Sequence, residues 1–341
     1  MRERETAVRR IVAIRPGALG DTLLAFPALA LLRRSYPDAH ITLIARRDVL
    51  PLARAWGLAD AVSPFDEPRW SAFFAPVPPV ESSVRATLDG AIAVAWLADQ
   101  DGRVAANLRA LGAKTVVIGP GRPREDRQTH AALQLARVFS ALGIAPPTDT
   151  AALPPLHLPT LVAIVGAPPA APGLLDTVGA SDGRPPRNAE TPEGGLMALH
   201  AGSGGAAKRW PPARFAALAG EIRTLGLCPV LIEGPQDGSI TSAVLAEAAR
   251  LHIELAVARN LDVLALARLL TGCAGYVGND SGVSHLAGLL GLRTLALFGP
   301  SDPAIWSPLG PRVHVQRSPT GALTDLSVAT VAASLHADLL P

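Results

Sequence analysis

The chain has 341 residues, of which 49% are hydrophobic and 18% are charged. This length exceeds the usual size of one hydrophobic core, so two domains are expected. The formal charge is only +2, and aromatic residues make up 4% of the chain. Nucleic acid is therefore not an expected partner, because its binding sites need basic surfaces and stacking side chains.

Cys228 and Cys273 are the two cysteines, too few for a disulfide framework and without metal-ligand spacing. Both lie in apolar segments, and we expect buried free thiols in a reducing compartment. The charged N-terminus does not resemble a signal peptide, and no apolar stretch is long enough for a membrane span. The sequence predicts a cytoplasmic protein, with peripheral contact at the inner membrane left open.

Apolar runs and helical periodicity alternate in the first part of the chain, which predicts a parallel sheet with connecting helices. Strands are expected at residues 10–14, 41–45, 91–95 and 115–118. Helices are expected at residues 23–36 and 130–142. The segment RPGALGD, residues 15–21, follows the first strand. It lies where open α/β sheets bind ligands, at a strand-to-helix turn.

Asp21 in this turn has two interpretations. It either caps the following helix, or it stands beside bare backbone as a general base. Gly17 and Gly20 are expected to permit positive φ and to let a ligand approach. The turn matches neither the GxGxxG dinucleotide motif nor a P-loop, which argues against hydride transfer and P-loop phosphoryl transfer.

Proline and glycine clusters mark residues 156–195 as an interdomain linker, partly irregular and with expected disorder near residues 178–194. A second α/β pattern follows it. Strands are expected at residues 196–200, 229–232, 275–278 and 294–298. Helices are expected at residues 211–225, in a segment that ends near residue 250, at residues 286–290 and at residues 327–340.

A loop of small residues, HAGSGGAAKRWP at residues 200–211, follows the first strand of this second pattern. Ser203, Lys208 and the backbone amides could bring a hydroxyl, a cation and N–H donors to a diphosphate. The alternative is an ordinary exposed loop with a solvated Lys-Arg pair.

The segment NDSGVSH, residues 279–285, is a second candidate anion site. Asp280 and Ser281 are good helix caps, Gly282 admits close approach, and the partial positive charge of a helix start favours an anion. His285, one turn into the helix, either touches the ligand or is a hydrogen-bonded structural residue.

Asp99 and Asp101 form a D-x-D pair, a pattern found in metal-dependent sugar transferases. Three-residue matches are common by chance, and an exposed turn is the preferred interpretation. We expect no required metal.

Taken in order, these segments resemble the heptosyltransferases of glycosyltransferase family 9, which act in lipopolysaccharide core assembly. The resemblance rests on GALGD, FPAL and YPDAHI within residues 11–44 and on residues 200–218, 278–291 and 298–302. It implies an α/β protein of GT-B fold, with two Rossmann-like domains facing a central cleft. Residues 1–155 would bind the acceptor and residues 196–322 the nucleotide sugar. Residues 323–341 would form a helix that packs back on the N-terminal domain.

The resemblance also implies an inverting, metal-independent transferase without a cofactor, which moves a heptose or related sugar from an ADP-sugar. The acceptor would be a lipid-linked saccharide like the lipopolysaccharide core. Asp21 would be the general base, with Arg15 and Gly20 near the reacting centre. Arg124, beside Glu125, would meet an acceptor phosphate.

On the donor side, the resemblance assigns Ser203 and Lys208 to the diphosphate and Asp237 to the ribose. It assigns the start of the donor-binding helix to Asp280, Ser281, Gly282 and His285.

Two other functions stay open at this point: a nucleotide-sugar epimerase or hydrolase on the GT-B fold, and a binding protein without catalysis. An epimerase should need further carboxylates around the sugar, whereas only Asp21 is clear. Asp21 and Lys208 together argue against a binding protein. The sequence makes no prediction of oligomeric state.

Overall fold

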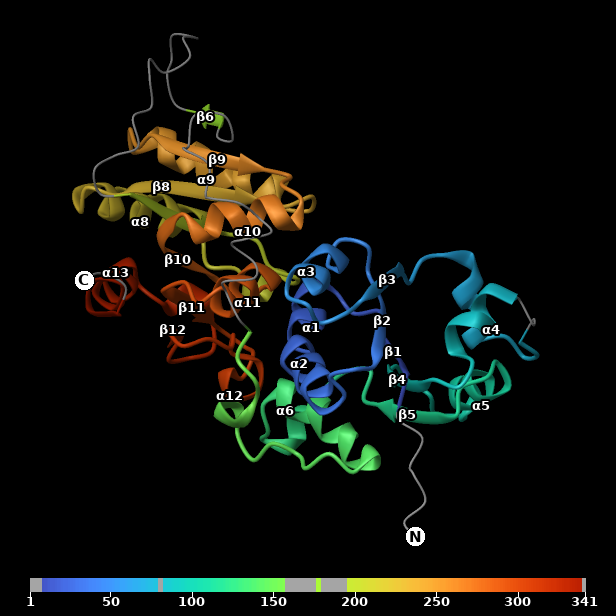
Figure 1. The fold of residues 1–341 in the computed structure, drawn as a ribbon. Coiled ribbons are helices and arrows are strands. Elements are labelled where there is room, and N and C mark those ends of the chain that lie inside the picture. The colour runs from blue at the N-terminus through green and yellow to red at the C-terminus, as the bar shows by residue number, and fades with distance from the viewer. Residues whose placement is uncertain (1–7, 79–81, 157–175, 179–194, 339–341) are drawn as a thin grey trace. The chain divides into compact units, whose positions relative to one another are not determined.

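A computed structural model describes residues 8–78, 82–156, 176–178 and 195–338. The chain divides into two compact units, residues 1–161 and 162–341 (Figure 1). The division falls inside the segment predicted to be the interdomain linker. Most of that segment, including residues 179–194 where disorder is predicted, lies outside the described residues.

The first unit is built on a five-stranded parallel sheet in the order β3-β2-β1-β4-β5. Its strands are β1 (Arg10–Arg15), β2 (His40–Ala45), β3 (Ala61–Pro64), β4 (Ile92–Trp96) and β5 (Thr115–Gly119). Its α-helices are α1 (Leu19–Leu23), α2 (Phe26–Ser35), α3 (Leu50–Ala55), α4 (Ser82–Leu88), α5 (Arg103–Ala110) and α6 (Ala131–Ala136). Short 3₁₀ segments are η1 (Pro68–Phe73), η2 (Glu125–Arg127), η3 (Arg137–Leu142) and η4 (Thr150–Ala152).

Helices cover both faces of this sheet, with α2 and α6 on one face and α4 and α5 on the other (Figure 1). The central strand β1 is buried from Ile11 to Arg15. Such a strand reads as a continuous apolar run because neither of its faces meets water. This explains why residues 10–14 were readily predicted from the sequence.

The helix predicted at residues 23–36 corresponds to α2, and the short helix α1, which was not predicted, precedes it. Pro27 lacks a backbone N–H and therefore suits the first turn of a helix, where no intrahelical partner is needed. The second helix accordingly begins at Phe26, with Pro27 in its first turn. The helix α1 begins at Leu19 and places Asp21 inside its first turn.

The second unit contains a seven-stranded sheet in the order β12-β11-β10-β7-β8-β9-β6. Its strands are β6 (Asp176–Val178), β7 (Leu196–His200), β8 (Cys228–Glu233), β9 (Leu255–Arg259), β10 (Cys273–Asn279), β11 (Thr294–Phe298) and β12 (Val313–Arg317). Its α-helices are α8 (Pro212–Thr224), α9 (Gly238–Arg250), α10 (Val263–Thr271), α11 (Gly282–Leu289), α12 (Pro303–Trp306) and α13 (Val328–Asp338). Two 3₁₀ turns are η6 (Ala206–Lys208) and η7 (Leu323–Asp325).

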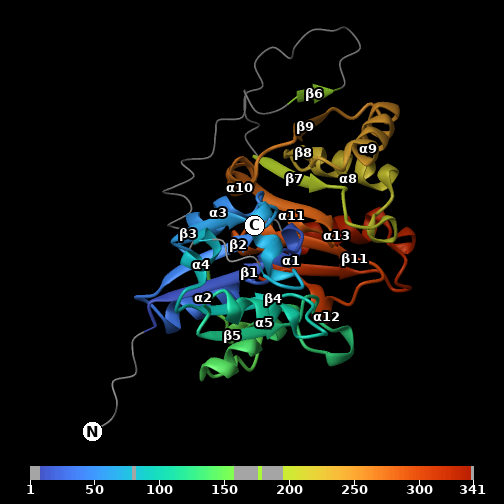
Figure 2. The ribbon, with the colours of Figure 1, turned by 90° about the vertical axis from the view of Figure 1, so that its right-hand side faces the viewer.

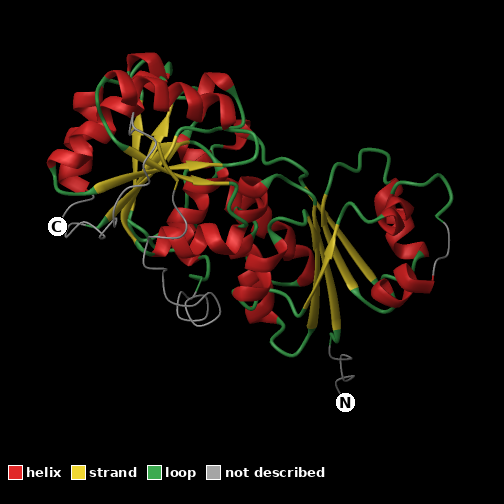
Figure 3. Ribbon diagram, turned by 90° about the horizontal axis from the view of Figure 1, so that it is seen from above, coloured by secondary structure: helices red, strands yellow, loops and turns green. Residues whose placement is uncertain are grey.

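Helices α8, α9 and α13 cover one face of this sheet, and α10 and α11 cover the other (Figure 2). Figure 3 shows the same layering, strands between two sets of helices, in each unit. The strand β6 was not predicted, because its residues fall in the segment predicted to be an irregular linker. It pairs antiparallel with β9, whereas the other strands of the sheet pair in parallel.

The last helix, α13, packs against α8, β11 and β12 of the second unit. Its residues Val331 and Leu335 are buried in the core of that unit, together with Leu326 just before the helix. The apolar side of the helix thus closes one face of the second sheet. The packing of residues 323–341 on the N-terminal domain stays a prediction.

The strand order reverses beside the first strand of each parallel run. In the first unit, β2 and β3 lie on one side of β1, and β4 lies on the other; in the second, β8 and β9 lie on one side of β7, and β10 lies on the other. Ligands of open α/β sheets bind at such switch points, outside the carboxyl ends of the strands. The three loops singled out from the sequence begin at the carboxyl ends of β1, β7 and β10.

Among the residues that the structure describes, no helix has both the length and the apolar character needed to cross a membrane.

Candidate functional site

The loops after β7 and β10 are joined by contacts that converge on Asp280. Lys208 Nζ lies 2.6 Å from Asp280 Oδ2, and Ser203 Oγ donates to the Asp280 carbonyl oxygen at 2.8 Å. Ser301, in the loop after β11, donates its hydroxyl to the same Oδ2 at 2.6 Å. The structure thus brings Ser203 and Lys208 to Asp280, which lies more than 70 residues further along the sequence.

Asp280 was predicted as a donor-binding residue, and its contacts define what it can do. Its side chain is 8% exposed, whereas that of Lys208 is 38% exposed. A buried carboxylate repels a diphosphate, but it can hold a lysine ammonium in place for one. Asp280 therefore orients the cation, and the exposed side of Lys208 is the part that a ligand can reach.

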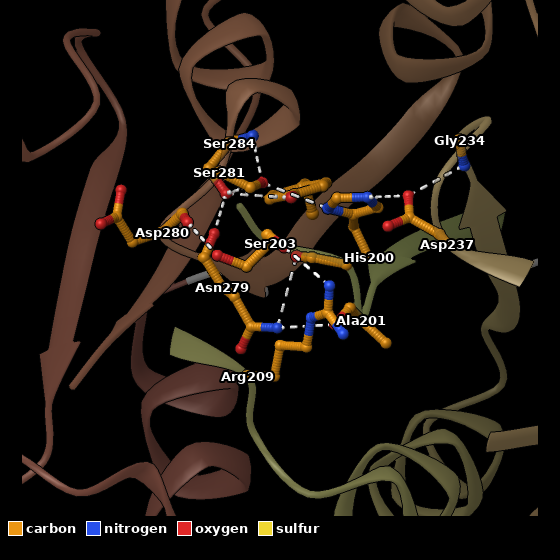
Figure 4. A network of polar contacts seen from close by, with 12 residues as sticks. His200, Ala201, Ser203, Arg209, Gly234, Asp237, Asn279, Asp280, Ser281 and Ser284 are labelled. Carbon is orange, nitrogen blue, oxygen red and sulfur yellow. Dashed lines mark hydrogen bonds and ion pairs between the residues drawn. The ribbon is translucent and has the colours of Figure 1, made fainter. Parts of the chain in front are cut away.

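Asn279 connects the same two loops through its side-chain amide. Its Oδ1 accepts from the backbone N–H of Trp210 at 3.0 Å. Its Nδ2 donates to the Ala201 carbonyl at 2.9 Å (Figure 4). Arg209 also donates to the Ser203 carbonyl at 3.0 Å. These bonds fix the small-residue loop, whose glycines alone would leave it with much conformational freedom.

His200, the last residue of β7, bridges the starts of two helices. Its Nδ1 lies 3.1 Å from Ser281 Oγ, and its Nε2 lies 3.1 Å from Asp237 Oδ2 (Figure 4). The hydrogen bond from His200 is the main cause that lowers the pKa of Asp237; burial opposes it, and the Gly234 N–H at 3.0 Å supports it. The carboxylate of Asp237 is therefore held in its ionised form.

Asp237 fits tightly between two glycines. A Cβ at Gly202 would lie 2.2 Å from Asp237 Oδ1, and a Cβ at Gly234 would lie 2.9 Å from Oδ2. Any larger residue at these positions would have to displace the carboxylate. The ribose role predicted for Asp237 concerns a group that is already engaged by His200 and Gly234.

The helix α11 begins as its sequence predicts. Ser281 is its N-cap, and its hydroxyl oxygen accepts from the Ser284 N–H. The N–H groups of the first helical residues, Gly282 and Val283, have no intrahelical acceptor and so are suited to an anion. His285 is buried at 5% exposure within this helix, which fits the structural interpretation of this residue better than direct ligand contact.

In the first unit, Arg15 and Asp21 flank the turn after β1. Arg15 is buried, and its guanidinium donates to the main-chain carbonyls of Gly121 at 2.6 Å and Asp21 at 3.2 Å. Burial lowers the pKa of Arg15, and the nearby Asp21 charge opposes this shift. The carboxylate of Asp21 is partly exposed, and its hydrogen bond is a long one, 3.3 Å from the Ala18 N–H.

The positive φ predicted for the glycines of this turn is wrong. Neither Gly17 nor Gly20 has a positive φ. A Cβ at Gly17 would lie 2.6 Å from Asp21 Cβ, so this position needs glycine because the Asp21 side chain passes over it. Gly20 is a residue of α1, and its carbonyl accepts from the Leu24 N–H at 3.0 Å.

Arg124 lies on the loop before η2, with 61% of its side chain exposed. It forms a two-pronged contact with Asp126, with distances of 3.0 and 2.5 Å, which raises its pKa. Its sequence neighbour Glu125 pairs instead with Arg122. The ion-pair partner of Arg124 is therefore Asp126 and not its sequence neighbour Glu125.

The D-x-D pair has a structural task. Asp99 accepts from the N–H groups of Val104 and Ala105 at 2.8 and 2.9 Å, and so caps α5, while Asp101 pairs with Arg103. In the described parts of the chain, no three His, Cys, Asp or Glu side chains are grouped as metal ligands would be.

Sequence reasoning missed several members of the second-unit site: His200, Arg209, Asn279, Ser284 and Ser301. Their positions carried a usable signal, because His200 and Asn279 are the last residues of β7 and β10, where ligands of parallel sheets bind. Ser301 lies in the segment FGPSD, residues 298–302, which is one of the segments that carry the family resemblance.

Comparison with known proteins agrees with this geometry. The family model described as glycosyltransferase family 9 (heptosyltransferase) matches residues 180–336, the part of the chain that holds this site. Residues 180–336 thus resemble glycosyltransferase family 9 in sequence. Lipopolysaccharide heptosyltransferase 2 of Escherichia coli K12 is 35% identical over 121 residues, 34% of either chain. Lipooligosaccharide heptosyltransferase 2 of Haemophilus influenzae is 29% identical over 140 residues, 40% of either chain. The chain thus aligns with well under half the length of these family 9 relatives.

Solved structures show the same fold over nearly the whole chain. E. coli heptosyltransferase WaaC with ADP has a TM-score of 0.69 at 18% identity, covering 96% of this chain and 99% of that one. A family 9 glycosyl transferase from Veillonella parvula has a TM-score of 0.72 at 19% identity, covering 97% of each chain. The GT-B fold with its two Rossmann-like domains is therefore confirmed.

The fold by itself does not separate a transferase from an epimerase. The UDP-GlcNAc 2-epimerase of Methanocaldococcus jannaschii has a TM-score of 0.53 at 9% identity, covering 97% of this chain and 93% of that one. The observation that favours a transferase is the match of residues 180–336 to the family model described as glycosyltransferase family 9 (heptosyltransferase).

Proposed function

We propose that the chain is a glycosyltransferase that moves a heptose from an ADP-linked donor to a saccharide acceptor of the lipopolysaccharide core type. The observation that carries this proposal is the convergence of Lys208, Ser203 and the start of α11 at the switch point of the second sheet. This group lies within the segment that matches family 9. Its cation, hydroxyl and helix N–H groups are the chemistry that a diphosphate requires.

In the proposed donor complex, Lys208 and the N–H groups of Gly282 and Val283 contact the diphosphate. Ser203 contacts the diphosphate through its hydroxyl, and Asp280 keeps Lys208 oriented. Asp237 is proposed to lie close to the donor ribose. Arg124 of the first unit is proposed to contact a phosphate of the acceptor, which its 61% exposed side chain allows.

The proposed reaction forms one C–O bond and breaks another. The acceptor hydroxyl oxygen attacks the anomeric carbon, and the bond from that carbon to the donor phosphate breaks, so ADP leaves with the electron pair. Asp21 takes the proton of the attacking hydroxyl as general base. Lys208 offsets the charge that develops on ADP. Attack opposite the leaving group inverts the anomeric configuration.

Asp21 is suited to this task by its contacts in the first unit. Within the described residues, its carboxylate accepts one long hydrogen bond and is partly exposed. Arg15 holds the main chain of the turn through two carbonyls and is proposed to support Asp21 rather than to contact the sugar. Gly20 is proposed to let the acceptor approach the turn.

The proposal includes a reaction without a metal or cofactor. A related fold makes this worth testing, because the dodecameric glycosyltransferase TibC of enterotoxigenic E. coli, with a TM-score of 0.51, is described as iron-containing. The cytoplasmic location and the peripheral membrane contact predicted from the sequence are parts of the same proposal.

Calorimetric titration with ADP, UDP and GDP tests the proposal directly. We expect ADP to bind at least tenfold more tightly than the other two, and ADP-heptose to be consumed in the presence of a heptose-deficient core acceptor. Treatment with EDTA should leave the rate unchanged. Selective binding of UDP would overturn the donor assignment, and a rate lost to EDTA and restored by a metal would overturn metal independence.

A further inference from the structure

The imidazole of His200 connects two helix starts that belong to different strand-helix units. Strand β7 lies between β8 and β10, which lead into α9 and α11 respectively. Asp237 is the N-cap residue of α9, and Ser281 is the N-cap residue of α11. His200 lies 3.1 Å from each of them, and its side chain is 5% exposed. One buried side chain therefore spans both flanks of the central strand (Figure 4).

The hydrogen bonds fix which nitrogen of His200 carries the proton. The ionised carboxylate of Asp237 can only accept, so Nε2 must be the donor of this bond. In the neutral imidazole, Nδ1 is then an acceptor, and the hydroxyl of Ser281 donates to it.

The same assignment of donors and acceptors extends to the hydroxyl groups of Ser284 and Tyr276. Ser284 donates to the Asn279 carbonyl at 2.5 Å, so its oxygen is free to accept from the hydroxyl of Tyr276 at 3.0 Å. Tyr276 is fully buried, and burial raises its pKa, which keeps the phenol protonated as a donor. Each of these three hydroxyl protons thus has one assigned acceptor.

Three glycines make room for this network. Gly202 and Gly234 accommodate the carboxylate of Asp237, as described above. A Cβ at Gly278 would lie 2.1 Å from the Tyr276 hydroxyl and 3.1 Å from the His200 carbonyl oxygen. Because the backbone packs closely against these side chains, a small displacement of His200 would shift the starts of both helices.

We propose that His200 is a positioning residue that fixes the starts of α9 and α11 relative to each other, so that the site is preorganised for the nucleotide diphosphate. This inference rests on the proposed function and deepens it. His200 itself contacts no ligand in this account. His200 holds Ser281, which directly precedes the first N–H groups of α11. It also holds Asp237, which lies beside Gly234. Preorganisation of this kind strengthens binding by reducing the cost of ordering the site.

Three substitutions distinguish the contact of His200 with Ser281 from its contact with Asp237. In His200→Asn the amide oxygen can replace Nδ1 and accept from Ser281, but the contact with Asp237 is lost. In His200→Gln the amide nitrogen can replace Nε2 and donate to Asp237, but the contact with Ser281 is lost. His200→Ala removes both contacts. His252→Asn is the matched control, because His252 is exposed and has a φ of 56°, which asparagine also adopts.

The readouts are the Kd for ADP, the kcat and donor KM of transfer, and the imidazole tautomer from ¹⁵N shifts of the wild-type protein. We expect His200→Ala to raise both Kd and KM by about tenfold or more, with kcat within about twofold, because uniform binding is lost. His200→Asn and His200→Gln should fall between it and the wild type, and His252→Asn should match the wild type. The wild-type His200 should be the Nε2–H tautomer.

Three results would overturn the inference. These are unchanged ADP affinity in His200→Ala, a fall in kcat at constant KM, which indicates only a smaller folded fraction, and an Nδ1–H tautomer in the wild type. A wild-type protein that neither binds ADP nor transfers a sugar would refute the proposed function instead. The tautomer measurement would still test the hydrogen-bond network in that case.

Discussion

Lys208 Nζ lies 2.6 Å from Asp280 Oδ2, so the cation proposed for the donor diphosphate is already paired within the second unit. The pair is unequal, because Asp280 is buried and Lys208 is 38% exposed. Asp280 also accepts from Ser301, which satisfies its carboxylate further. The donor would therefore meet an ammonium group that is held in place but still accessible from one side.

Replacing Lys208 with methionine should weaken ADP binding by about tenfold to a hundredfold, since a hydrogen bond to a charged group is worth about 1.5–3 kcal/mol. Calorimetry measures this directly. Lys114→Met is the matched control, because Lys114 is the other lysine of the chain and is exposed before β5. Equal ADP affinity in Lys208→Met and Lys114→Met would remove Lys208 from the diphosphate site.

Asp280→Asn should bind ADP about twofold to tenfold more tightly than the wild type at low salt. The amide oxygen can still accept from Lys208, whereas the negative charge that opposes the diphosphate is gone. The gain should shrink as salt is added, because screening weakens the interaction between the charges. Weaker binding in this variant would mean that the ionised carboxylate itself is needed by the ligand.

Gly17→Ala tests the turn after β1 without changing the chemical identity of Asp21. The added Cβ would lie 2.6 Å from Asp21 Cβ, so the Asp21 side chain has to move. A misplaced catalytic group can cost about 100-fold in rate, and we expect kcat to fall by this order while the Kd for ADP stays constant. A variant with wild-type kcat would show that the position of Asp21 is not critical.

Asp237 should contribute a pH-dependent part of stability. Its pKa is lowered in the folded chain, chiefly by the hydrogen bond from His200. A lowered pKa stabilises the fold above the ordinary aspartate range, and this contribution is lost as the pH falls through the folded value, below about 4. The stability difference between the wild type and Asp237→Asn should therefore be constant from pH 6 to 5 and shrink towards pH 3.

Urea unfolding across this range measures the difference, with Glu221→Gln as a control, because Glu221 is exposed on α8 of the same unit. A difference that grows on acidification would contradict the sign of the shift.

Much of the fold was accessible from the sequence because its central strands are buried on both faces. Strands β1, β7 and β11 are continuous apolar runs with turn residues after them. The strands β3 and β9 and the edge strand β12 were missed. β3 has four residues with a proline at its end, and β12 is partly exposed and includes His314 and Gln316. Such short strands carry little periodicity.

The site was predicted in its loops but not in its connections. Small residues, caps and a lysine after strands indicate anion binding wherever they occur, so Ser203, Lys208 and Ser281 could be selected. The bridge from His200 to Asp237 depends on the pairing of β7 with β8, and the bond from Lys208 to Asp280 depends on that of β7 with β10. These registers follow from packing of the whole unit, which no local pattern encodes.

The rate of ADP release from ADP-heptose with a heptose-deficient core acceptor, compared between the wild type and Asp21→Asn, tests the central claim most directly. We expect turnover in Asp21→Asn to fall by about two orders of magnitude or more, as for loss of a positioned base. Its ADP affinity should be unchanged. Asp99→Asn, which alters only the cap of α5, should retain the wild-type rate. Acceptor-dependent ADP release at the wild-type rate in Asp21→Asn would contradict the account, as would its absence in the wild type.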